Sequence, residues 1–213
     1  TVNANQPVSV TITSSAPGNT ICQGTSVTFT ATPFNGGPNP VYQWKLNGSN
    51  VGSNQNTYTT STLNNGDKVS VELTSNITPC AVGSPANSDE ILMTVNENKP
   101  VSVTITSSAT GNTICEGTEV TFNATPVHPG NTPHYQWKLN GVNVGTNQNT
   151  FTTSLLKDGD IVKVVLTSNI TPCAMDNPAT SNEITTTVNT NQLVSVTIAS
   201  SATGNTICEG TEV

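Results

Sequence analysis

The sequence predicts an all-β protein made of tandem β-sandwich domains. Three features carry this prediction: a 93-residue internal repeat, short segments in which apolar and polar side chains alternate, and turn sequences rich in Gly, Pro and Asn between them. An apolar period of two indicates strands with one face buried and one face in solvent. No segment shows the period of an amphipathic helix.

The repeat organises the whole chain. A shift of 93 residues aligns the conspicuous residues of successive copies: Cys22 with Cys115 and Cys208, Trp44 with Trp137, and Cys80 with Cys173. We therefore expect the end of one unit at 1–5, complete units at 6–98 and 99–191, and the start of a further unit at 192–213. Because neither Thr1 nor Val213 falls at a unit boundary, we expect the chain to be a segment of a longer array.

Within one unit, six segments have the alternation of a strand, the last being the weakest: 8–13, 27–31, 42–46, 69–73, 91–95 and 57–63. Six or seven strands in about 90 residues are typical of a sandwich. The aromatic residues lie on the apolar phase of their strands. We expect the core to contain Phe29, Tyr42 and Trp44 in one unit and Phe122, Tyr135 and Trp137 in the next.

The cysteines follow the repeat. Each complete unit contains two cysteines 58 residues apart, which predicts one disulfide within each unit: Cys22–Cys80 and Cys115–Cys173. Cys208 would then pair with a residue beyond the chain. Zinc is the alternative, but one cysteine pair per unit without C-x-x-C spacing or a recurring histidine is a poor ligand set. Disulfides indicate an oxidising compartment outside the cytosol.

One series of motifs resembles an immunoglobulin-type sandwich: Cys22, then Tyr42-Gln43-Trp44, then Gly66-Asp67-Lys68-Val69-Ser70-Val71, then Cys80. In antibody domains both cysteines lie in the middle of strands, whereas here one precedes its strand and the other follows. The unit is therefore more similar to bacterial immunoglobulin-like and PKD-like repeats. It resembles repeats in giant surface proteins of Bacteroidota, including gliding-motility adhesins and appendages exported by the type 9 secretion system. This resemblance implies a secreted protein at the bacterial cell surface.

Composition excludes several classes of partner. Thirteen acidic residues face six lysines, which gives a net charge of −7, and charged residues make up only 9% of the chain. A protein that binds nucleic acid needs a basic surface, and so does a protein that binds an anionic membrane. This chain has the opposite charge balance. No apolar run is long enough to insert into a membrane.

The residues that bear chemistry form no recurring catalytic set. We find no repeated Ser/His/Asp or Cys/His arrangement, and we therefore expect no enzyme activity, cofactor or metal. His128 and His134 are absent from the first unit, so we interpret them as solvated loop histidines. Asp67 and Asp160 precede a strand in a Gly-Asp turn and are interpreted as turn-capping residues, because calcium would need more oxygen ligands nearby.

The sequence thus predicts a structural repeat of a secreted surface filament or adhesin, in which short connectors join the units into a stiff stalk. Its expected partners are neighbouring repeats, with lateral association of arrays and a cell-surface or glycan ligand at a distal tip as further expectations. One alternative is a multivalent carbohydrate- or surface-binding module. The other is a set of accessory domains of a larger secreted enzyme.

Overall fold

The computed structural model describes residues 2–210 and 212; Thr1, Thr211 and Val213 lie outside the described residues. The described chain is all-β, and its helical segments are three short 3-10 turns: η1 (Pro17–Asn19), η2 (Thr110–Asn112) and η3 (Thr203–Asn205). We call 6–98 repeat 1 and 99–191 repeat 2, as the sequence divides them. None of the helices in the described residues is long and apolar enough to cross a membrane.

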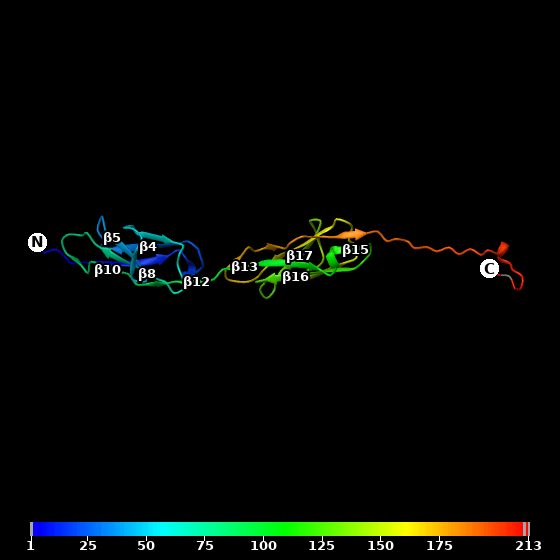
Figure 1. The fold of residues 1–213 in the computed structure, drawn as a ribbon. Helices are drawn as coiled ribbons and strands as arrows, with labels where there is room; N and C mark the ends of the chain where they lie inside the picture. The colour runs from blue at the N-terminus through cyan, green and yellow to red at the C-terminus, as the bar shows by residue number, and fades with distance from the viewer. Residues whose placement is uncertain (1, 211, 213) are drawn as a thin grey trace. The chain divides into compact units, whose positions relative to one another are not determined.

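Repeat 1 contains two antiparallel sheets that enclose its core (Figure 1). One sheet has the order β2-β4-β7, and in the other β5 lies between β6 and β8, with β10 and β11 both paired to β8. The strands are β1 (Gln6–Pro7), β2 (Ser9–Ser14), β3 (Thr20–Cys22), β4 (Val27–Phe34), β5 (Val41–Leu46), β6 (Ser49–Val51), β7 (Thr57–Thr60), β8 (Lys68–Thr74), β9 (Ala81–Val82), β10 (Ala86–Asn87), β11 (Ile91–Leu92) and β12 (Thr94–Asn96).

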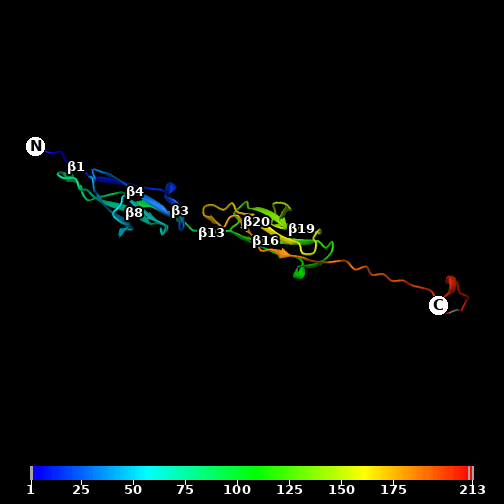
Figure 2. The same cartoon turned by 90° about the horizontal axis from the view of Figure 1, so that it is seen from above.

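Two short parallel ladders close opposite ends of this sandwich. β1 pairs with β9, and β3 pairs with β12. Figure 2 shows β1 and β3 at the two ends of repeat 1. The segment expected as one strand over 91–95 is divided at Met93, because β11 pairs antiparallel with β8 whereas β12 joins β3. The end of the unit therefore leaves the main sheet and forms part of an end ladder.

The core lies where the alternating apolar side chains of the two sheets meet. Trp44 and Phe29 have no exposed surface, and their ring centroids lie 6.4 Å apart. Tyr58 packs against both rings, 6.2 Å from Phe29 and 5.9 Å from Trp44. The indole N–H donates to the carbonyl of Gln55 at 2.9 Å. The largest apolar side chain of the unit is thus buried with its polar atom satisfied, as a buried tryptophan requires.

Repeat 2 has the same pattern of sheets. Its strands are β13 (Lys99–Pro100), β14 (Ser102–Ser107), β15 (Thr113–Cys115), β16 (Val120–Val127), β17 (His134–Leu139), β18 (Val142–Val144), β19 (Thr150–Thr153), β20 (Ile161–Thr167), β21 (Ala174–Met175), β22 (Ala179–Thr180), β23 (Ile184–Thr185) and β24 (Thr187–Asn189). Phe122, Trp137 and Phe151 form the equivalent aromatic cluster.

Backbone contacts divide the chain into two compact units. The first contains Thr1–Val103 together with two segments of repeat 2, Pro126–His134 and Leu166–Thr180. The second contains Thr104–Thr125, Tyr135–Val165 and Ser181–Val213. The residues around Cys173 therefore belong to the same compact unit as repeat 1.

Candidate functional site

The cysteines are the recurring chemical feature of the chain, and their pairing differs from the expected one. The structure contains a disulfide between Cys22 and Cys173, with 5.5 Å between the Cα atoms and 151 residues between the two positions. Cys80, Cys115 and Cys208 are free. The bonds Cys22–Cys80 and Cys115–Cys173, expected from the 58-residue spacing, are not formed, and the one bond joins two repeats.

Topology explains this correction. Cys22 ends β3 and stands opposite Asn96, at the end of repeat 1 where the chain leaves it. The carbonyl of Cys80 accepts a hydrogen bond from the backbone N–H of Gln6 at 2.8 Å, at the end where the chain enters. Between the two ends runs β8, whose seven residues span about 23 Å. A disulfide needs Cα atoms within roughly 7 Å, so two cysteines at opposite ends cannot bond.

The segment Asn96–Lys99, which we call the connector, holds both bonded cysteines in place. Gln23, the residue after the first cysteine, donates its N–H to the carbonyl of Asn96 at 2.9 Å. Its own carbonyl accepts a hydrogen bond from Asn98 Nδ2 at 3.2 Å. The N–H of Lys99 donates to the carbonyl of Cys173 at 2.9 Å. Three of the four connector residues, Asn96, Asn98 and Lys99, thus hydrogen-bond to Cys173 or to the residue after Cys22.

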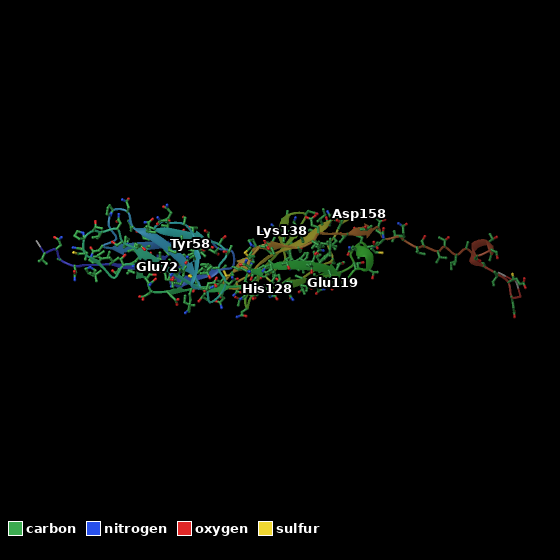
Figure 3. All side chains as sticks on the ribbon, turned by 60° about the vertical axis from the view of Figure 1, so that its left-hand side comes forward. Tyr58, Glu72, Glu119, His128, Lys138 and Asp158 are labelled. Carbon is green, nitrogen blue, oxygen red and sulfur yellow. A yellow bond between two sulfur atoms is a disulfide. The ribbon has the colours of Figure 1, made fainter. Side chains whose placement is uncertain are left out.

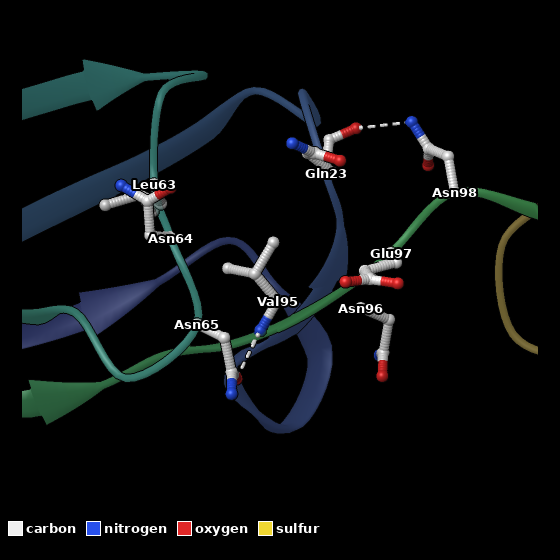
Figure 4. A pocket seen from close by; sticks show the side chains of 8 residues that line it. All are labelled: Gln23, Leu63, Asn64, Asn65, Val95, Asn96, Glu97 and Asn98. Atoms are coloured by element: carbon white, nitrogen blue, oxygen red, sulfur yellow. Dashed lines mark hydrogen bonds between the residues drawn. The ribbon is translucent and has the colours of Figure 1, made fainter.

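A hollow of about 340 Å³ lies beside the connector (Figure 4). Eight residues line it: Gln23, Leu63, Asn64, Asn65, Val95, Asn96, Glu97 and Asn98. The Oδ1 atom of Asn98 is buried without a hydrogen-bond partner. The equivalent residues of repeat 2 line a hollow of about 220 Å³. The hollow therefore recurs with the repeat, but its chemistry does not: amides and aliphatic carbon dominate in repeat 1, whereas Glu116, Lys157 and Asp158 line it in repeat 2.

The tryptophans are unavailable as ligand-stacking platforms. Trp44 and Trp137 are both 0% exposed, and Trp137 Nε1 donates to the carbonyl of Gln148 at 2.9 Å. Tyr42 and Tyr135 are buried as well, and this burial raises the pKa of each phenol above its ordinary value. The recurring aromatic residues thus hold the two sheets together.

The Gly-Asp turn is an intramolecular cap. Asp67 accepts hydrogen bonds from the N–H of Asn64 and from Asn47 Nδ2, both at 2.8 Å. Asn47 Oδ1 in turn accepts the N–H of Lys68 at 2.9 Å. Asp160 makes the equivalent contacts in repeat 2. These contacts bear out the interpretation of both aspartates as capping residues. Among the described residues no group of three or more His, Cys, Asp and Glu side chains could hold a metal.

His128 has a structural contact that the sequence did not indicate. It occupies the position of Asn35, whose Nδ2 donates to the carbonyl of Pro7 at 2.7 Å. His128 Nδ1 lies 2.8 Å from the carbonyl of Pro100. The histidine therefore connects, in repeat 2, the loop and strand that are equivalent to those connected by Asn35 in repeat 1. Both residues have a positive φ. Figure 3 shows His128 among the side chains of repeat 2.

No protein-family model matches the chain, and no curated protein matches its sequence. Its structural neighbours are immunoglobulin-like and fibronectin III-like tandem domains. Three N-terminal domains of the Hoc outer capsid protein of bacteriophage RB49 align with 86% of this chain and 59% of their own, at 16% identity and a TM-score of 0.36. The chain thus spans less than two thirds of that structure.

Two further neighbours have similar statistics. One is a structure concerning the host cell surface retention of a 1.5-MDa bacterial ice-binding adhesin. The alignment covers 89% of this chain and 67% of that chain, at 15% identity and a TM-score of 0.40. The fibronectin III-like modules of Clostridium thermocellum CbhA cover 89% of this chain and 100% of their own, at 11% identity and a TM-score of 0.35. Similarity at this level defines no role for the chain, and its fold is the tandem two-sheet β-sandwich that the strand pairing shows.

Proposed function

We propose that this chain is a structural repeat of a secreted bacterial surface filament or adhesin, in which tandem sandwiches form a stalk for attachment, gliding or capture. One observation carries the proposal: a disulfide joins one copy of a 93-residue unit to the next. A covalent link between copies is useful to a protein that transmits force. It is of no evident use to modules that each bind a ligand independently.

The chemistry of the described residues supports the same proposal. The aromatic residues that recur are buried in the core, and the recurring aspartates are committed to turns. A disulfide persists in an oxidising environment, which agrees with an extracellular location. The resemblance of the unit to repeats of Bacteroidota surface proteins, including gliding-type adhesins and type 9-secreted appendages, supports a position on the cell surface.

Immunogold labelling of the cells that make the protein tests the proposal. An antibody raised against the chain should label the surface of unpermeabilised cells, along extended structures and at regular intervals. Label confined to the cytoplasm would refute the proposal. If the antibody instead recognised a soluble secreted hydrolase in the culture medium, the accessory-domain alternative would be favoured.

The carbohydrate-binding alternative makes a separate prediction. Both tryptophans should emit at short wavelength and resist quenching by iodide, and added oligosaccharides should leave the emission unchanged. A saturable spectral change on adding a glycan would favour the multivalent binding module over the stalk.

A further inference from the structure

We propose that every repeat of this type carries half of an inter-repeat disulfide at each end, so that Cys80 and Cys115 are the unpaired halves of two further links. In each link the first cysteine of one repeat bonds to the second cysteine of the following repeat, as Cys22 does to Cys173. This inference concerns covalent connectivity and does not depend on the stalk function.

The half-site at Cys115 repeats that at Cys22. Cys115 ends β15 and stands opposite Asn189 of β24, as Cys22 ends β3 opposite Asn96. The N–H of Glu116 donates to the carbonyl of Asn189 at 2.9 Å, and Asn191 Nδ2 donates to the carbonyl of Glu116 at 3.2 Å. The same contacts, at the same distances, hold Gln23 beside the formed disulfide.

The half-site at Cys80 repeats that at Cys173. The carbonyl of Cys80 accepts the N–H of Gln6 at 2.8 Å, as that of Cys173 accepts the N–H of Lys99 at 2.9 Å. Cys80 has a φ of 80° and Cys173 a φ of 71°. Both values lie in the left-handed region, which residues other than glycine and asparagine rarely adopt. The free cysteine thus shares the positive φ of the bonded one.

The opposite positions of the two half-sites exclude a bond within one repeat. Cys115 ends β15 in the ladder β15·β24, and Cys173 immediately precedes β21 in the ladder β13·β21. These two ladders correspond to the ladders at opposite ends of repeat 1. Cys115 is exposed, whereas Cys22, its bonded equivalent, is half-buried. A thiol held at an open end is available to the repeat that follows.

Forming each link is an oxidation. Two thiols lose two protons and two electrons and form one S–S bond, while the disulfide of a thiol–disulfide oxidant gains them and becomes two thiols. A disulfide-bonded oxidoreductase of an oxidising compartment would be such an oxidant, and in vitro oxidised glutathione serves the same purpose.

The chain's own sequence provides the test. Val213 is equivalent to Val120, so joining residues 121–191 after Val213 completes a third repeat with a copy of Cys173. After refolding with oxidised glutathione, non-reducing digestion and mass spectrometry should find Cys115 bonded to that copy, alongside Cys22–Cys173. A bond between Cys208 and the copy of Cys173 would overturn the proposal, and so would a free Cys115.

A variant of the original chain tests the same point without an extension. In Cys22→Ser, Cys173 loses its partner while Cys115 of its own repeat remains free. We expect Cys173 to become reactive to alkylation and to form no bond with Cys115, with Cys208→Ser as the matched control that leaves Cys22–Cys173 intact. A Cys115–Cys173 bond in the variant would refute the assignment.

Discussion

Reduction of Cys22–Cys173 should greatly lengthen the chain under tension. The bond connects positions 151 residues apart. When the chain is pulled by its ends, force passes from Cys22 to Cys173 through the bond, and the residues between them bear no load. Once the bond is reduced, a fully unfolded chain should gain about 500–540 Å, at 3.3–3.6 Å per residue.

Optical trapping of single chains with and without a reductant would measure this gain. Most strands of both sandwiches lie inside the loop, so the oxidised chain should extend only through its terminal segments. Cys22→Ser should behave like the reduced chain, and Cys115→Ser like the oxidised wild type. Equal contour lengths in oxidising and reducing buffer would refute the pairing. An increase of only about 190–210 Å, which a loop of 58 residues would give, would indicate a bond within one repeat.

Three further outcomes are expected in repeat 1. Gly52→Ala should lower the unfolding free energy in urea more than Gly48→Ala does: both have positive φ, which costs about 1–2 kcal/mol for alanine, but only at Gly52 would the new Cβ lie 3.0 Å from Tyr58. Asp67→Ala removes the acceptor of two hydrogen bonds and should cost about 1–3 kcal/mol, so an unchanged urea midpoint would contradict the capping role. Burial raises the pKa of Tyr42 above 10.0. Its stabilising contribution should therefore be complete below pH 10.0 and lost as the pH rises through the pKa of the folded state. In a pH titration, tyrosinate absorbance should appear at higher pH in the folded chain than in the unfolded chain.

The main sheets could be predicted from the sequence because their strands are long enough to show a period. Val27, Phe29 and Ala31 alternate with threonines along β4, and all three are buried. The end ladders could not be predicted, because β1 and β9 have two residues each and no alternation can be read in two residues. The break at Met93 is not visible in the sequence for a related reason, since an uninterrupted apolar phase does not show that a strand changes its partner.

The candidate site was predictable in its residue type and not in its pairing. A repeated cysteine pair indicates a disulfide. In a periodic array, however, the sequence does not show whether the bond forms within one repeat or between successive repeats. The first cysteine of one repeat lies 58 residues before the second cysteine of the same repeat and 151 before that of the next, and both choices are identical in every copy. Only the fold decides between them, because it places the two cysteines of one repeat at opposite ends.

The two choices give an array different physical properties. Bonds within repeats would make each unit a separately closed domain, and the connectors would be the sole covalent path between them. Bonds between successive repeats provide a second covalent path beside each connector, so cleavage of the backbone at Asn96–Lys99 would leave the Cys22–Cys173 bond still joining the two pieces. The same bond closes a loop of 151 residues, which by chain entropy opposes unfolding by about 5 kcal/mol. Because that loop runs through two repeats, its stabilising effect couples their unfolding, whereas bonds within repeats would stabilise each one alone.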